Sequence, residues 1–163
     1  MTSATFAELL TLGSYMFDGC IALTTPSFPK LTTTSMYAFR NCTNLVSITF
    51  PSTVTAFSKY LFDGCTALTT ITAPGLTNIY ESLLNECSNL TTIVLDHVVS
   101  VGDYAFSDCG KLGVVALPAC VTIGKYLGSG IGSTGFDFTL KITLGANAFS
   151  GSTNMLHLIL RSS

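Results

Sequence analysis

The sequence predicts a β-rich α/β solenoid of about seven stacked coils, each about 22 residues long. Cysteine recurs at positions 20, 42, 65, 87 and 109, at intervals of 22 or 23 residues. A similar phrase precedes most of these cysteines, as in residues 15–20 (YMFDGC), 37–42 (YAFRNC), 60–65 (YLFDGC) and 104–109 (YAFSDC). Self-similarity at a fixed period of about 20 to 29 residues is typical of stacked coils. The 48% of apolar residues supplies a continuous core for them.

Each coil is predicted to contain two extended segments and one turn. The coils share an aromatic anchor column that runs Phe17, Phe39, Phe62, Leu84, Phe106, Gly128 and Phe149. Apolar residues follow each anchor in alternation, as at Leu90, Ile93 and Leu95, and predict a half-buried strand, which proline usually ends. A second apolar pair, such as Val98 and Val101, predicts a shorter extended segment on the opposite wall. Between the walls, the stretch that ends in cysteine predicts one α-helical or 3₁₀ turn.

The sixth coil departs from this pattern, because residues 128–135 (GSGIGSTG) replace its anchor and part of its strand. Phe136 and Phe138 lie one place before their expected columns, which predicts a one-residue slip with a local bulge. We expect residues 1–163 to form a single solenoid domain. Neither end carries a polar capping unit, and solenoids need caps to cover their core. We therefore expect the chain to be a segment of a longer array, or its ends to be covered by partners.

The repeat resembles a known family over essentially the whole chain. Residues 112–118 follow the pattern L-x-x-I-x-L-P, and residues 98–109 follow V-x-x-I-G-x-x-A-F-x-x-C. Through these motifs the chain resembles the BspA-type leucine-rich repeat family. The resemblance implies a curved, right-handed leucine-rich-repeat solenoid of the kind found in surface proteins of host-associated bacteria and mucosal protists. Some members adhere to host matrix or plasma proteins, so it also implies a cell-surface or secreted location and no catalytic motif.

The six cysteines are predicted to be reduced and buried rather than paired. Five of them occupy one column, which Ile131 and Ser152 fill in the later coils. A position that accepts isoleucine is apolar, and free cysteine behaves as a small buried hydrophobe. Cys120 belongs to a different inward column. A zinc site would need close pairs such as C-x2-C, and the sequence has none.

Charge and hydropathy exclude several classes of function. Only 10% of residues are charged and the net charge is −2, so the electrostatic attraction on which nucleic-acid binding depends is missing. No apolar run approaches the length of about 18 residues that a membrane span needs, and residues 1–6 do not resemble a secretory signal. Residues 130–135 match G-x-G-x-x-G, but a predicted strand follows where a dinucleotide site needs a helix. No cofactor is expected.

Stacking turns columns of the repeat into ladders of neighbouring side chains. Opposite charges recur about one coil apart, and we expect them to pair on the surface. One column holds Asp18, Arg40 and Asp63. Another holds the pairs Lys59 with Glu81 and Asp103 with Lys125. Tyrosine fills one column at Tyr15, Tyr37, Tyr60, Tyr104 and Tyr126. We interpret these rings as packing residues at a corner of the coil. The alternative is an exposed platform on which sugars or peptides stack.

The candidate binding site is the outward face of the predicted strands, which is nearly uncharged and rich in hydroxyl groups. Its residues are Thr24, Thr25, Ser47, Thr49, Thr69, Thr70, Thr72, Thr91 and Thr92. Threonine is also simply a good residue for an exposed strand. As a binding surface, however, hydroxyl and methyl groups suit broad contact with a protein or a glycan, from a host or from another copy of the chain.

The sequence offers little for catalysis. The two histidines, His97 and His157, lie far apart, and a nucleophile set of Asp96, His97 and Ser100 is improbable because adjacent residues of an extended segment point to opposite sides. We therefore expect no enzymatic activity. The leading hypothesis is a non-catalytic protein-interaction or adhesion module. The alternatives are a structural spacer in a larger surface protein and a hydrolase that uses Asp96 and His97.

The carboxyl-terminal strand is predicted to be an edge at which the chain associates. By register, Leu156, His157 and Ile159 face outward, and two of the three are large aliphatic residues. Exposed strand edges with apolar side chains favour pairing with another chain. We therefore expect self-association here, or contact with further repeats.

Overall fold

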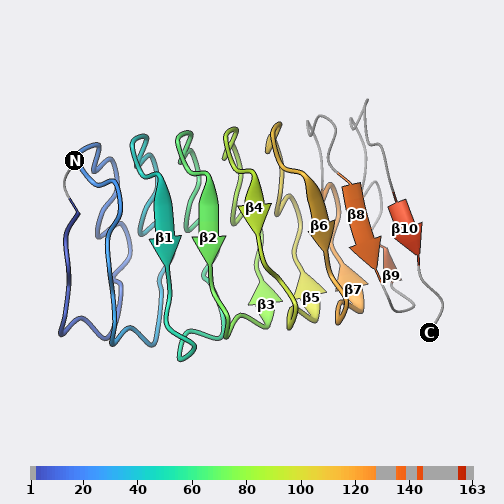
Figure 1. The fold of residues 1–163 in the computed structure, drawn as a ribbon, viewed down its shortest axis with the longest axis horizontal. Helices are drawn as coiled ribbons and strands as arrows, with labels where there is room; N and C mark the ends of the chain where they lie inside the picture. Colours follow the sequence, from blue (N-terminus) through green and yellow to red (C-terminus); the bar gives the residue numbers. More distant parts are fainter. Residues whose placement is uncertain (1–2, 128–134, 139–142, 145–157, 161–163) are drawn as a thin grey trace.

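The computed structural model describes residues 3–127, 135–138, 143–144 and 158–160. Figure 1 shows coils that lie side by side in sequence order, from the blue amino-terminal end to the red carboxyl-terminal end. One wall of the stack contains β1 (Ser47–Thr49), β2 (Thr70–Thr72), β4 (Thr92–Ile93), β6 (Val114–Ala116), β8 (Gly135–Phe138) and β10 (Leu158–Leu160). The other contains β3 (Asn78–Ile79), β5 (Ser100–Val101), β7 (Thr122–Ile123) and β9 (Thr143–Leu144). The strand-rich solenoid predicted from the sequence is therefore confirmed.

All the paired strands are parallel, and each pairs with the equivalent strand of a neighbouring coil. The first wall forms the sheets β1-β2-β4 and β6-β8-β10, and the second wall forms the sheet β3-β5-β7-β9. Ile48 is in register with Ile71, and Ile71 with Ile93, so the sequence period equals one coil. In the coil before β1, Ser27 joins the first wall as an isolated bridge residue and no strand forms. Pro26, next to it, has no N–H group to donate, so a continuous ladder cannot form there.

The predicted helical turn is wrong for the described residues, which contain turns but no helix. Arg40 N–H donates to Tyr37 O within its own coil (3.1 Å), but Asn41 N–H donates to Asp63 O in the next coil (2.8 Å). Tyr37 (φ 60°) and Asn41 (φ 56°) are both left-handed, and a right-handed helix cannot pass through such residues. The same pair of left-handed residues recurs at Tyr15 and Gly19, Tyr60 and Gly64, Ser82 and Glu86, and Tyr104 and Asp108.

A single hydrophobic core runs through the described coils. The anchor rings stack in line, with centroids of Phe17 and Phe39 5.4 Å apart and those of Phe39 and Phe62 5.6 Å apart, all nearly parallel. Leu84 and Phe106 continue the column and are fully buried. Among the described residues, every buried side-chain nitrogen and oxygen has a hydrogen-bond partner. The core columns predicted from the sequence are therefore confirmed in this part of the chain.

The predicted slip in the sixth coil is present in the backbone register. Val115 pairs with Phe136, and Thr122 pairs with Thr143, so both offsets are 21 residues. The bulge expected at residues 128–134, and the column residues Ile131 and Ser152, lie outside the described residues. No helix in the described ranges is long and apolar enough to cross a membrane.

Candidate functional site

All nine residues of the predicted binding face lie on the outer side of the first wall, at exposed or half-buried positions. In β1 and β2 they flank an inward isoleucine: Ser47 and Thr49 flank Ile48, and the same pattern recurs around Ile71. The sequence folds this way because the side chains of a strand alternate between its two faces. The outward placement of these residues is thus a structural fact, and their binding role stays a prediction.

The register of the sheet arranges many of these hydroxyl groups in two ranks. Ser47, Thr70 and Thr92 are in register, and Thr49 is in register with both Ser27 and Thr72. We define the hydroxyl face as an inner rank of Thr25, Ser47, Thr70 and Thr92 and an outer rank of Ser27, Thr49 and Thr72. Neighbouring coils are about 4.8 Å apart in such a sheet, and the two ranks are about 6.6 Å apart along each strand.

None of the seven hydroxyls of the hydroxyl face takes part in a hydrogen bond with another part of the described chain. The contrast with other threonines is clear. Thr69 Oγ1 donates to Val46 O (3.0 Å), and Thr91 Oγ1 donates to Thr69 O (3.1 Å). On the second wall, Thr32 and Thr77 likewise donate to carbonyls one coil away. Thr69 and Thr91 were predicted as ligand contacts, but their hydroxyl protons are already used within the chain.

Two open hollows adjoin the hydroxyl face. The first, here called the proline hollow, has a volume of about 390 Å³ and is lined by Thr25, Pro26, Ser27, Phe28, Pro29, Ser47, Thr49, Phe50 and Pro51. The second, here called the valine hollow, has a volume of about 460 Å³ and is lined by Ser3, Thr24, Thr25, Asn44, Val46 and Ala67. Thr25 lines both. Neither hollow is lined by a charged side chain, so both suit an uncharged ligand. Neither hollow could be predicted from the sequence, because the shape of each depends on how neighbouring coils pack.

The proposed hydrolase set is not assembled. Asp96 and His97 are exposed and line a small hollow of about 100 Å³ with Ala73, Pro74, Leu76 and Val94. Ser100 Oγ instead donates to Asn78 Oδ1 (2.7 Å) on the second wall. Among the described residues, no hydrogen bond joins Asp96, His97 and Ser100, so nothing here activates a serine nucleophile. The described residues also include no group of three metal-ligating side chains.

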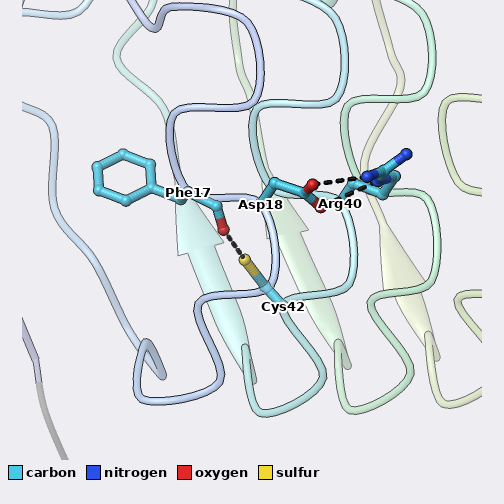
Figure 2. Close-up of polar contacts among 4 residues, drawn as sticks. All are labelled: Phe17, Asp18, Arg40 and Cys42. Atoms are coloured by element: carbon cyan, nitrogen blue, oxygen red, sulfur yellow. Dashed lines mark hydrogen bonds and ion pairs between the residues drawn. The ribbon is translucent and has the colours of Figure 1, made fainter.

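The cysteines form a ladder of free thiols, as predicted. None is in a disulfide, and five are buried as predicted, whereas Cys20 was predicted to be buried and is only half-buried. Cys42 Sγ donates to Phe17 O in the preceding coil (3.0 Å), as Figure 2 shows. Cys65, Cys87 and Cys109 repeat this contact with the preceding anchor carbonyl, at 3.0, 3.3 and 3.1 Å. The sequence predicted the burial of these thiols but not their bond to the neighbouring coil.

Burial disfavours the charged thiolate at these positions. It raises the pKa of Cys42 to about 12 and that of Cys120 to about 11. The same loss of solvation also raises the pKa values of Cys65, Cys87 and Cys109 well above the usual value. Since the thiolate is the reactive form, these cysteines are structural groups rather than nucleophiles.

Two of the predicted charge pairs are confirmed as ion pairs between neighbouring coils. Arg40 binds both carboxylate oxygens of Asp18, at 2.9 and 2.6 Å (Figure 2), and holds the pKa of that carboxyl below its usual value. Lys59 Nζ lies 2.8 Å from Glu81. Asp103 instead accepts a hydrogen bond from the backbone N–H of Lys125 (2.7 Å). A pair that the sequence reading missed joins Lys30 to Glu8, which are also 22 residues apart.

The tyrosine column packs ring against ring, as favoured from the sequence. The centroids of Tyr15 and Tyr37 are 4.9 Å apart, and those of Tyr37 and Tyr60 and of Tyr104 and Tyr126 are 4.8 Å apart, all nearly parallel. Tyr37 is therefore covered by a ring on each face, whereas Tyr15, at the end of the column, is 50% exposed.

The predicted association edge lies mostly outside the described residues. Leu156 and His157 are not described, and Ile159 is placed only through the backbone of β10, where it pairs with Asp137 of β8. Association at this edge stays a prediction.

Parallel coils with a polar outer sheet define a repeat protein of the solenoid class, and its described residues hold no assembled catalytic set. The chain belongs to the BspA-type leucine-rich repeat family: residues 10–130 match the BspA type Leucine rich repeat region, in six copies. This family is generally associated with protein interaction or adhesion rather than with catalysis, and its members are often cell-surface proteins. No protein of curated function matches the chain.

Solved structures with this fold come from several bacteria. A leucine-rich repeat protein from Eubacterium ventriosum ATCC 27560 is 28% identical, with a TM-score of 0.77 over 94% of this chain and 43% of its own. One from Bacteroides ovatus ATCC 8483 is 26% identical, with a TM-score of 0.73 over 95% of this chain and 48% of its own. The T. pallidum Leucine Rich Repeat protein, 23% identical, shares the fold, with a TM-score of 0.71 over 78% of this chain and 75% of its own. The chain thus spans less than half the length of the first two.

Proposed function

We propose that the chain is a non-catalytic interaction module that binds a partner through the hydroxyl face. One observation carries this proposal: the seven hydroxyls of this face make no hydrogen bond within the described chain, whereas threonines of the second wall such as Thr32 and Thr77 do. A hydroxyl can both donate and accept a hydrogen bond. Seven such groups, arranged in two ranks, offer a partner many directional contacts.

The partner class follows from the chemistry of the face. It carries no charge, so it suits an uncharged region of a protein or a neutral glycan rather than a nucleic acid or an acidic ligand. Family membership supports adhesion at a cell surface, or by a secreted protein, as the setting. A structural spacer is the competing function, and a spacer would not need a surface of unbonded hydroxyl groups.

The proposal is tested by measuring attachment of the purified chain to a panel of immobilised matrix proteins, plasma proteins and neutral oligosaccharides by biolayer interferometry. The binding variant is Thr70→Lys with Thr72→Lys. The control is Val99→Lys with Val121→Lys, which adds the same charge to exposed positions of the second wall. We expect the first pair to weaken binding at least about tenfold, which corresponds to about 1.4 kcal/mol, and the control pair to change it less than about twofold.

A spacer gives a different result. If no member of the panel binds, or if the two pairs of substitutions weaken binding equally, the hydroxyl face is not the binding surface.

A further inference from the structure

We infer that the partner segment is an extended, uncharged peptide with aliphatic side chains, bound across the valine and proline hollows at the amino-terminal end of the hydroxyl face. This inference rests on the proposed function, because it assigns a location and a ligand class to that same face. It makes residues 24–29 and 44–51 the main contact region.

The arrangement of the two hollows gives the location and direction of the ligand. Asn44 and Val46 line the valine hollow, and Thr49 and Pro51 line the proline hollow farther along the same chain segment. Thr25 lines both hollows and connects them. The two hollows therefore follow each other along the strand direction. A ligand that fills both spans about 23 Å, the length of about seven extended residues.

The lining chemistry favours a peptide without charges. No charged side chain lines either hollow, so a charged ligand group would lose solvation there without gaining an ion-pair partner. The side chain of Val46 is 43% exposed, and with Ala67 it gives the valine hollow an apolar wall. Between the hollows, Thr25 and Ser47 present hydroxyls that are free within the described chain and can pair with the alternating N–H and C=O groups of an extended main chain.

The same lining disfavours a glycan. Sugar rings commonly pack on the open face of an aromatic ring, and the two aromatic residues of the proline hollow, Phe28 and Phe50, are each only 1% exposed. The stacked tyrosines cover one another's faces, as at Tyr15 and Tyr37. The hollows thus offer aliphatic and hydroxyl contacts but no open aromatic face.

The test uses the isotope-labelled chain and three probes, with binding followed by the NMR shifts of backbone amides. The probes are a short capped peptide of alternating valine and threonine, the same peptide with lysine in place of valine, and a linear neutral glucose oligosaccharide. We expect only the uncharged peptide to shift amides of residues 24–29 and 44–51. Val46→Lys should weaken its binding about tenfold, because the apolar contact is lost and the peptide would desolvate the added charge. Val121→Lys, at a valine that is 46% exposed on the second wall, should change binding less than about twofold.

Each of the other outcomes contradicts one part of the inference: the ligand class, the location or the proposed function. Equal shifts with the lysine peptide, or an equal effect of the two lysine substitutions, overturn the assignment of an uncharged ligand to the valine hollow. Shifts with the oligosaccharide alone overturn the peptide class. If the uncharged peptide shifts only residues 70–94, or shifts nothing while panel proteins still bind in a manner sensitive to Thr70→Lys with Thr72→Lys, the location fails and the proposed function stands. If neither the peptide nor any member of the panel binds, the proposed function is wrong as well.

Discussion

At the scale of single residues, the cysteine column is explained by a hydrogen bond that joins neighbouring coils. Phe39 O accepts the backbone N–H of Cys42 in its own coil (3.2 Å) and the thiol of Cys65 in the next coil (3.0 Å). A carbonyl oxygen has two lone pairs, so both bonds are satisfied. The column therefore requires a small side chain that is largely apolar yet carries a weak donor, and cysteine meets both requirements.

This contact predicts which cysteines matter for stability. Cys87→Ala removes a fully buried sulfur and its bond to Phe62 O, so we expect a loss of about 1 to 3 kcal/mol in the free energy of unfolding by urea. Cys20→Ala is the control, because Cys20 is half-buried and has no such thiol contact in the described chain, and it should cost less than about 0.5 kcal/mol. Equal costs would show that the thiol contact contributes nothing.

The reactivity of the thiols should follow the same order. With a colorimetric thiol reagent near neutral pH, we expect at most Cys20 to react promptly in the native chain, because burial protects the other five cysteines and keeps them protonated. Unfolding in urea should then expose all six thiols. Prompt reaction of several thiols in the folded chain would mean that the column opens readily.

At the scale of elements, the coils meet so closely that some positions have no room for a side chain. Gly102 follows β5, and a Cβ atom placed there would lie 2.7 Å from the backbone nitrogen of Glu81 in the preceding coil. Gly124 occupies the equivalent position after β7 and would meet the backbone at Asp103 in the same way. The glycine of the V-x-x-I-G motif is thus required by close backbone approach.

Gly102→Ala should accordingly destabilise the stack. We expect a loss of about 2 to 4 kcal/mol in unfolding free energy, since the obstructing atoms belong to the backbone and cannot move aside cheaply. Gly110→Ala is a matched substitution with nothing within 4 Å of the added methyl group, and its effect should lie within about 0.5 kcal/mol. Thermal unfolding followed by circular dichroism measures both. A neutral Gly102→Ala would mean that the coils can separate locally.

The sequence was sufficient to predict the columns, because the pairing of Ile48, Ile71 and Ile93 follows directly from the repeat period. The one-residue slip was also predictable, because Phe136 lies one place before its expected column in the sequence, and it pairs with Val115. The actual turn was not predicted, because a left-handed tyrosine such as Tyr37 is uncommon. In this turn, hydrogen bonds to the next coil, such as Asn41 N–H to Asp63 O, replace the bonds of a helix. The sequence also could not show which hydroxyls form hydrogen bonds within the chain. Thr69 and Thr70, for example, are adjacent threonines, and only the hydroxyl of Thr69 is bonded within the described chain.

At the scale of the whole molecule, stability is a sum of similar contacts between neighbouring coils, and the buried thiols make that sum depend on pH. In an unfolded chain a thiol has a pKa near its usual value of 9.0, whereas in the folded chain burial raises the pKa of Cys42 to about 12 and that of Cys120 to about 11. Above pH 9 the folded state therefore binds more protons than the unfolded state. The contribution of the buried thiols to stability is therefore fully present below pH 9, and it is lost as the pH rises toward the folded pKa values.

We therefore predict steep alkaline unfolding between about pH 9 and 11. Each buried thiol contributes a loss that approaches about 1.4 kcal/mol per pH unit once the pH is well above 9 and still below the folded pKa. The five buried cysteines together contribute at most about 7 kcal/mol per unit, which is comparable to the whole stability of a typical domain. Urea unfolding at several pH values measures the slope, and Cys65→Val with Cys87→Val should reduce it by about 2.8 kcal/mol per unit whatever its effect on stability at pH 8. A slope that does not change on removing these two thiols would mean that other groups govern the alkaline transition.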